Sequence, residues 1–191
     1  MKSVKTLLAG VAIGAPLSIV GMQPSTAQSS IDLTTLRNTA LAQHNTYRTR
    51  HRVPTMTLDN SLNQTAQNWA QYLAKNALFE HSSASQRNSA GENLYVFYTT
   101  GSAISANQLM TNSTKGWYNE VSAYNYARPT FSAATGHFTQ MVWKNSTRLG
   151  CGAAQGMKNM NGRRYTALYV VCHYSPAGNV LGQFPENVLK P

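Results

Sequence analysis

Apolar residues recur at three- and four-residue steps in the first half of the chain, a spacing typical of helices that bury one face. The first such stretch follows Asp32, a residue type that caps helix N-termini, and it ends before Val53-Pro54. The second follows Asp59, and its buried face would carry Leu62, Ala66, Trp69, Ala70, Leu73 and Ala77. The pattern therefore predicts two amphipathic helices, with His81 just beyond the second.

A third helix is predicted for residues 105–122. Leu109 and Trp117 would share its buried face with Glu120, so this carboxylate would project from the apolar side. Glutamate is rarely buried unless it has a partner. A helix face displaced by one position would instead leave the side chain in water. Glu120 is therefore either a functional candidate or an ordinary surface residue.

Extended structure is predicted for residues 94–98, 149–155 and 163–174, which alternate or are rich in β-branched and aromatic side chains. Asn161-Gly162 lies between the last two stretches and favours a hairpin. Residues 137–143 are expected to form a short helix or turn. Helices interleaved with a few antiparallel strands indicate an α+β sandwich of helix, sheet and helix layers.

Residues 1–27 have the pattern of a secretory signal. Two lysines precede a mainly apolar run of 15 residues at positions 7–21, and Ser25-Thr26-Ala27 supplies the small residues of a cleavage site. The run is shorter than the roughly 20 residues that a membrane-spanning helix needs. The expected product is an exported protein, secreted or periplasmic, with one domain at residues 28–191 and no transmembrane segment.

Charge and cysteine content narrow the expected partners. The formal net charge is +10, and two of these charges lie in the predicted signal. The excess favours contact with an anionic envelope or membrane surface. It includes no long basic run, so nucleic acid is not an expected partner. Cys151 and Cys172 are the only cysteines, and an even pair in an oxidising compartment predicts a disulfide.

Four ionisable residues have glycine or aromatic neighbours and are expected to be partly buried and partnered. They are His81, Glu92, Glu120 and His137. Two imidazoles and two carboxylates suit a divalent metal ion, most plausibly zinc, with histidine nitrogen as first ligand and carboxylate as further ligand or orienting group. A lone histidine beside apolar residues usually only packs, so the prediction of a metal site depends on all four being together.

Four segments resemble the signatures of one family. They are His44-Asn45-Thr46-Tyr47-Arg48, Gly91-Glu92-Asn93-Leu94, Gly136-His137-Phe138-Thr139-Gln140-Met141-Val142-Trp143 and Tyr169-Val170-Val171-Cys172-His173-Tyr174-Ser175-Pro176-Ala177-Gly178-Asn179. The sequence resembles the CAP superfamily, or SCP domain, of cysteine-rich secretory proteins, antigens and pathogenesis-related proteins. The resemblance implies a three-layer α-β-α sandwich with a small antiparallel sheet. It also implies a Cys151–Cys172 disulfide and a central cleft lined by His81, Glu92, Glu120 and His137.

The loop before His137 carries Tyr124, Tyr126 and Phe131. This spacing resembles the aromatic motif through which some CAP proteins bind sterols. The rings would otherwise pack beneath the loop, as tyrosine and phenylalanine commonly do. Few bulky apolar residues adjoin the loop in sequence, and exposed aromatic patches tend to mark interaction sites. We therefore predict that the loop binds a sterol or similar apolar lipid, independently of the four metal-site residues.

Three classes of function fit these features. The preferred one is a binding protein with a metal cleft and an apolar ligand. The second is a metal- or His/Glu-assisted hydrolase, which the sequence supports less because it contains no GxSxG motif and no catalytic cysteine. The third is an extracellular signalling or envelope-interaction protein in which the four residues hold the loops together.

Overall fold

The computed structural model describes residues 31–102 and 104–191, so the predicted signal segment lies outside the described residues. The elements in chain order are α1 (Leu33–Arg50), β1 (Thr57–Leu58), α2 (Asn60–Asn76), β2 (Gly91–Thr99), α3 (Ala106–Asn119), the 3-10 helix η1 (Glu120–Ala123), α4 (Gly136–Met141), β3 (Arg148–Met160), β4 (Arg163–Ser175) and α5 (Phe184–Asn187). None of the described helices combines the length and apolar character needed to cross a membrane.

The predicted helix starts are confirmed by their caps. The Asp32 carboxylate accepts hydrogen bonds from two backbone N–H groups of the first turn of α1, and Asp59 accepts one from Leu62 N. These bonds satisfy donors that have no partner inside the helix. The third helix is shorter than predicted, because α3 ends at Asn119 and the chain tightens into η1 at Glu120.

Four strands form one sheet in the order β1-β3-β4-β2. β3 and β4 form an antiparallel hairpin closed by Asn161 and Gly162. Their φ angles of 49° and 75° are positive, and Asn-Gly is favoured in hairpin turns because these two residues adopt positive φ readily. β2 pairs antiparallel with β4 and forms an edge of the sheet. An antiparallel sheet was expected, but β1 runs parallel to β3, so the sheet is mixed.

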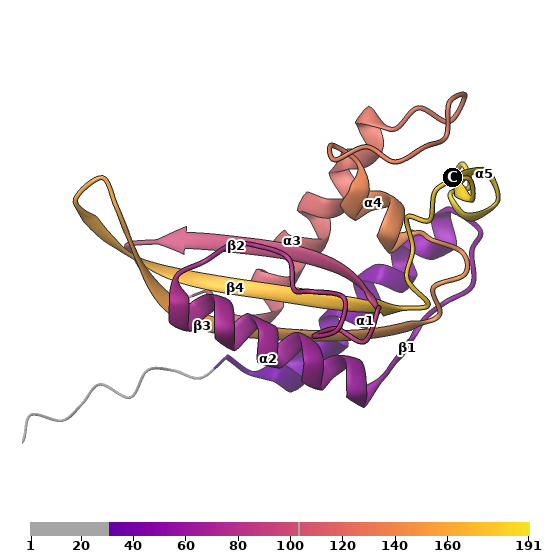
Figure 1. Cartoon of the computed structure of the whole chain (residues 1–191). Helices are drawn as coiled ribbons and strands as arrows, with labels where there is room; N and C mark the ends of the chain where they lie inside the picture. Colours follow the sequence, from indigo (N-terminus) through magenta and orange to yellow (C-terminus); the bar gives the residue numbers. More distant parts are fainter. Residues whose placement is uncertain (1–30, 103) are drawn as a thin grey trace, which may run out of the picture.

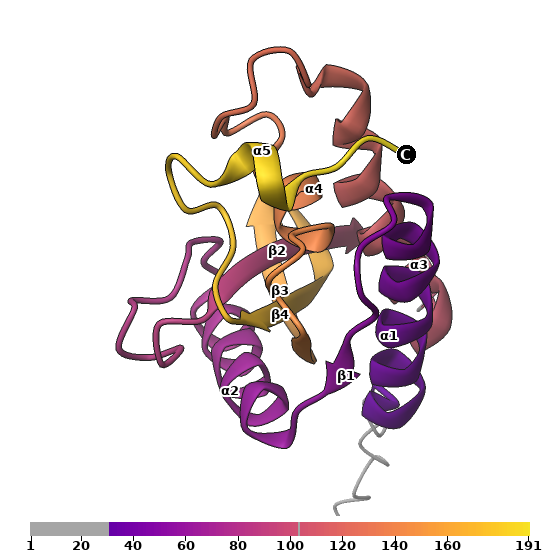
Figure 2. The same ribbon diagram turned by 90° about the vertical axis from the view of Figure 1, so that its right-hand side faces the viewer.

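Helices cover both faces of the sheet, which confirms the α+β sandwich (Figures 1 and 2). Alternate β4 residues point to opposite layers. Leu168, Val170 and Cys172 join the core beneath α1, α3 and α4, whereas Ala167, Tyr169 and Val171 join the core beneath α2. The same alternation separates neighbouring residues of β2, and it decides which layer each functional side chain faces.

Glycines in β3 allow α2 to pack unusually close to the sheet. A Cβ atom at Gly150 would overlap the backbone of α2 at Leu62 and Asn63, and one at Gly152 would overlap it at Gln67. The adjoining helix face is lined with small residues, including Ala66 and Ala70. This close approach brings the first turns of α2 next to the end of β4, where the functional site lies.

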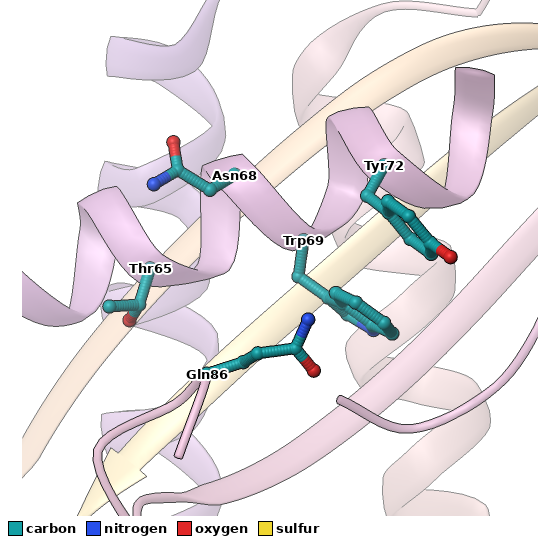
Figure 3. Close-up of a pocket in the computed structure, with 5 residues that line it drawn as sticks. All are labelled: Thr65, Asn68, Trp69, Tyr72 and Gln86. Carbon is teal, nitrogen blue, oxygen red and sulfur yellow. The ribbon is translucent and has the colours of Figure 1, made fainter. Parts of the chain in front are cut away.

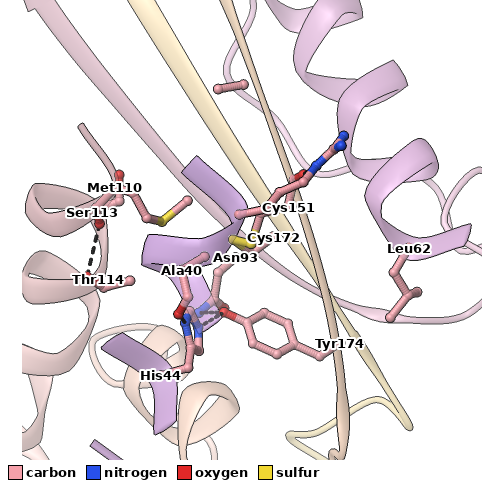
Figure 4. Close-up of a disulfide and its surroundings, with 12 residues drawn as sticks. Ala40, His44, Leu62, Asn93, Met110, Ser113, Thr114, Cys151, Cys172 and Tyr174 are labelled. Atoms are coloured by element: carbon pink, nitrogen blue, oxygen red, sulfur yellow. Dashed lines mark hydrogen bonds between the residues drawn. A yellow bond between two sulfur atoms is a disulfide. The ribbon is translucent and has the colours of Figure 1, made fainter. Parts of the chain in front are cut away.

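The predicted disulfide is present. Cys151 of β3 and Cys172 of β4 are directly opposite each other in the sheet, with Cα atoms 4.2 Å apart (Figure 4). Both are fully buried in the core beneath α1 and α3. The bond therefore links two strands that the backbone ladder already pairs.

Arg48 is a charged residue that the fold buries. Its side chain is fully buried at the end of α1, and its guanidinium donates to the backbone carbonyls of Pro54, Met141, Trp143 and Ser146 at 2.7–3.0 Å. Burial lowers the pKa of Arg48 to about 10. A planar group with five N–H donors suits this role, because it joins several loop carbonyls at one point.

A second buried network connects α1 to the sheet (Figure 4) and, through Asn93, to α4. His44 Nδ1 donates to the Ala40 carbonyl, so its Nε2 is free to accept from the Tyr174 hydroxyl 2.9 Å away. The Asn93 amide donates both to that hydroxyl and to the His137 carbonyl. Burial lowers the pKa of His44 to about 4, which keeps the ring neutral at ordinary pH.

This network makes the protein sensitive to acid above the range in which carboxylates titrate. His44 stays neutral in the folded state but takes up a proton near pH 6.5 when the chain unfolds, so stability falls as pH drops from 6.5 towards 4. The full loss amounts to about 3 kcal/mol, at about 1.4 kcal/mol per pKa unit.

Urea unfolding at several pH values between 7.5 and 5 measures this loss. We expect His44→Gln to be less stable at pH 7.5 but to show a slope of stability against pH shallower by up to about one proton. A slope identical to that of the wild type would show that His44 is not responsible.

Candidate functional site

The predicted site lies at the start of the edge strand β2. His81 approaches from the segment after α2, Glu92 is the second residue of β2, and His137 is the second residue of α4. These three residues line a cleft of about 170 Å³, together with Asn93, Phe131, Ala133, Gly136 and Asn179. The structure thus brings both predicted histidines and Glu92 to one cleft, whereas Glu120 lies behind His137.

Glu92 is the most strongly held side chain of the site. Its carboxylate is 1% exposed and lies 2.7 Å from His81 Nδ1 and 3.0 Å from His173 Nε2. The backbone N–H and the hydroxyl of Ser82 also donate to it, at 2.9 and 2.7 Å. Burial alone would raise the pKa of Glu92, but the hydrogen bonds from His173, His81 and Ser82 outweigh it and hold the pKa far below its usual value.

Glu120 makes the corresponding contacts with His137. One carboxylate oxygen lies 2.7 Å from His137 Nδ1, and the other accepts from the backbone N–H groups of His137 and Phe138 at 3.0 and 3.1 Å. The side chain is 21% exposed, so the expectation that it leaves the apolar side of the third helix is only partly met. Glu120 acts by fixing both the ring and the backbone of His137.

The four predicted residues therefore form two His–Glu pairs rather than one cluster. Within residues 31–102 and 104–191, no three His, Cys, Asp or Glu side chains are grouped so as to hold a metal ion together. Each carboxylate occupies the Nδ1 side of its histidine, and the Nε2 atoms of His81 and His137 make no hydrogen bond to the described residues. A carboxylate on Nδ1 is the usual orienting partner of a metal-binding imidazole.

A third imidazole in the site was missed by the sequence analysis. His173 is fully buried, and it joins Glu92 to the Thr65 hydroxyl of α2, which lies 2.9 Å from its Nδ1. His173 stands directly opposite Glu92 in the β2–β4 pairing. The residue was visible in the motif around Cys172, but its role depends on the strand register, which periodicity does not supply.

The segment after β4 holds α4 in place. The Gln140 side chain accepts from Gly178 N at 2.8 Å and donates to Ser146 Oγ. Asn179 accepts from the Thr139 hydroxyl and donates to the Gly136 carbonyl. The family-like motifs that contain these residues therefore fit against one another and fix the position of His137.

The aromatic loop is packed at Tyr124 and exposed at Phe131. Tyr124 is 8% exposed and packs edge-on against Phe138, and Tyr126 packs against Tyr124 with ring centres 4.8 Å apart. The packed alternative therefore holds for Tyr124, and Tyr126 is partly buried, because α3 and α4 supply apolar partners that are distant in sequence. Phe131 is 48% exposed and lines the His/Glu cleft.

The fold and the site together define an α-β-α sandwich protein with a cleft lined by two histidines, each of which is held by a glutamate. Comparison with known proteins assigns the family: the model described as "CAP: Cysteine-rich secretory protein family" matches residues 41–174. The chain belongs to this family. The Golgi-associated plant pathogenesis-related protein 1 of Homo sapiens is 39% identical over 156 residues, which cover 81% of this chain and 92% of that protein.

Fungal relatives and solved structures agree with this assignment. Protein PRY2 of Saccharomyces cerevisiae is 36% identical over 77% of this chain, and Secreted protein RBT4 of Candida albicans is 35% identical over 86%. The chain spans less than half of the length of these two proteins, 39% and 45%. A crystal structure of NaASP2 with Zn2+ matches with a TM-score of 0.61 and 25% identity, over 82% of this chain and 85% of that one.

The buried Glu92 carboxylate should stabilise the fold at neutral pH. Because the pKa of Glu92 is lower in the folded state than its ordinary value of 4.5, its contribution is present above pH 4.5 and is lost as pH falls below it. We expect Glu92→Gln to lower the free energy of unfolding by about 3 kcal/mol at pH 7, with a smaller deficit at pH 3.5.

Urea unfolding in the presence of a chelator provides the measurement. Glu80→Gln is the matched control, since Glu80 is an exposed glutamate before His81 and its loss should change stability by less than about 0.5 kcal/mol. Equal effects of the two substitutions would contradict the role given to Glu92.

Proposed function

We propose that this CAP protein is exported and binds a divalent metal ion, most plausibly zinc, in the cleft between His81 and His137. The observation that carries the proposal is the shared geometry of the two histidines. Both line the same cleft, and both have Nδ1 on a carboxylate, which leaves Nε2 as the atom available for a metal. The NaASP2 structure with Zn2+ supports this choice of metal, because that protein shares the fold at 25% identity.

Glu92 and Glu120 orient the histidines in this proposal. Each carboxylate fixes the ring tautomer by accepting from Nδ1, and it favours a cation nearby by its negative charge. Two imidazoles leave open coordination positions, which water or a ligand group can fill. His173 is a positioning residue, because it holds Glu92 against α2 from the side opposite His81.

Binding is preferred to hydrolysis because the described site offers no prepared nucleophile. Ser82 is 4% exposed, and its hydroxyl donates to Glu92, so the oxygen is committed to holding the carboxylate. A hydrolase would have to use a metal-bound water, with Glu92 as a base. The low pKa of Glu92 makes it a weak base at neutral pH. Turnover that disappears with chelator or with Glu92→Gln would favour this second function.

An apolar ligand at the aromatic loop is the second part of the proposal. Phe131 supports it, because this exposed ring lines the cleft, whereas Tyr124 and Tyr126 do not line it. The two tyrosine hydroxyls are buried without a hydrogen-bond partner in the described residues. We infer that a sterol or similar lipid contacts Phe131 first, and that Tyr124 and Tyr126 shape the loop beneath it.

Export and an anionic envelope or membrane surface are the setting that we propose. The signal-like segment and the net charge of +10 support it, as does the similarity to Secreted protein RBT4. Nucleic acid is not a proposed partner. If the protein bound neither metal nor lipid, the His–Glu pairs would serve to hold the loops of an extracellular signalling or envelope-interaction protein.

Zinc binding is tested by calorimetry on the chelator-treated protein. We expect one zinc ion per chain and at least a tenfold loss of affinity in His81→Ala and in His137→Ala, since each removes one of two nitrogen ligands. Affinity should also weaken on acidification, because a protonated imidazole does not bind metal.

Glu186→Gln is the control for non-specific binding, because this exposed carboxylate belongs to α5 and lines no part of the cleft. Unchanged zinc affinity in the His81→Ala, His137→Ala double variant would rule out the assignment.

Lipid binding is tested with labelled cholesterol in the presence of chelator. We expect Phe131→Ala to reduce binding about fivefold or more, because an exposed aromatic ring contributes contact area to an apolar ligand. The double histidine variant should bind as the wild type does. Leu181→Ala, at an apolar side chain 74% exposed, is the control for non-specific hydrophobic contact. Absence of sterol binding by the wild type would refute the lipid proposal.

A further inference from the structure

A second hollow lies between α2 and the loop of residues 82–90, outside the His/Glu cleft (Figure 3). Its volume is about 310 Å³, within the range of small-molecule sites. Four lining residues come from one face of α2 at helical spacing, and the fifth comes from the loop. They are Thr65, Asn68, Trp69, Tyr72 and Gln86. None of these five residues carries a charge.

Two aromatic rings form a fixed platform in this hollow. Trp69 and Tyr72 are stacked, with centroids 4.7 Å apart and planes inclined by 13°. The Trp69 indole donates to the Glu80 carbonyl at 3.0 Å, which anchors the pair to the chain leaving α2. Tyr72 is 43% exposed, so the platform remains accessible to a ligand. An exposed ring held this rigidly loses little conformational freedom when a ligand packs on it.

Two amide groups beside the platform are oriented by the protein. Gln86 Oε1 accepts from Ser83 N at 2.8 Å, while Gln86 N donates in return to Ser83 Oγ. Asn68 Oδ1 accepts from Gln64 Nε2 at 2.8 Å. In both cases the amide oxygen is used internally, and the NH₂ group has no partner among the described residues. Figure 3 shows the Gln86 amide reaching from the loop towards the Trp69 ring.

We propose that this pocket binds a neutral carbohydrate. A sugar ring presents C–H groups on one face, which pack on an aromatic ring, and hydroxyl oxygens at its edge, which accept from amide NH₂ groups. The uncharged lining does not favour a phosphate, a carboxylate or a sulfated sugar, because none of the five residues would neutralise it. The pocket contains none of the proposed metal ligands, so a failure of the zinc proposal would not affect the carbohydrate proposal.

Nuclear magnetic resonance titration with defined sugars tests this inference. The probes are cellotriose, laminaritriose, maltotriose and tri-N-acetylchitotriose, each added to the ¹⁵N-labelled protein in the presence of chelator. We expect at least one of them to shift, saturably, the Trp69 indole signal and the side-chain NH₂ signals of Asn68 and Gln86. Affinity in the millimolar range is typical of one ring on an open site, so each titration extends to about 20 mM.

Substitutions distinguish this pocket from the rest of the surface. We expect Tyr72→Ala and Gln86→Ala each to weaken binding about fivefold or more, and Tyr72→Phe, which keeps the ring, to bind within about twofold of the wild type. Phe79→Ala is the matched control, because Phe79 is a similarly exposed ring that does not line the pocket. The proposal is overturned if no probe shifts these signals, if the shifts map elsewhere, or if Tyr72→Ala binds as the wild type does.

Discussion

The buried carboxylate of Glu92 is the constraint around which the site is built. A charge that is 1% exposed must be compensated, and the protein does so with four hydrogen bonds from two separate segments. Ser82 and His81 are drawn in from the loop after α2, and His173 is supplied by the neighbouring strand. Satisfying one carboxylate thus fixes the edge of the sheet, the loop and the first histidine of the cleft together.

The alternation of side chains along β2 explains why the site extends across both layers. Glu92 faces the α2 layer, where it meets His173, which in turn contacts Thr65. Asn93, the next residue, faces the other layer and donates to the His137 carbonyl and the Tyr174 hydroxyl. Each histidine is therefore held from its own side of the sheet, and the cleft lies where the two layers meet at the edge strand.

The degree of burial separates the parts of the molecule that maintain the fold from those that can meet a ligand. Arg48, His44 and His173 are fully buried and fully engaged in hydrogen bonds, so their charge and polarity serve the structure. His81 has a side chain 60% exposed, and Phe131 is 48% exposed. Recognition at the cleft must begin with such accessible groups, which the buried networks hold in fixed positions.

The sequence by itself determined what depends on local spacing. Periodicity and the aspartate caps predicted the first two helices, Asn161-Gly162 predicted the hairpin, and the motifs indicated the family and the cysteine pair. Of the four residues predicted for the cleft, His81, Glu92 and His137 line it. The two-residue β1 and the four-residue α5 were too short to produce a periodic signal.

Only the tertiary structure decided which distant groups meet. It paired His173 with Glu92, buried Arg48 among loop carbonyls, and packed Tyr124 against α4 while leaving Phe131 open. It also divided the four predicted metal-site residues into two His–Glu pairs. These outcomes depend on strand register and on packing between layers, which join residues far apart in the chain and leave no periodic trace in the sequence around them.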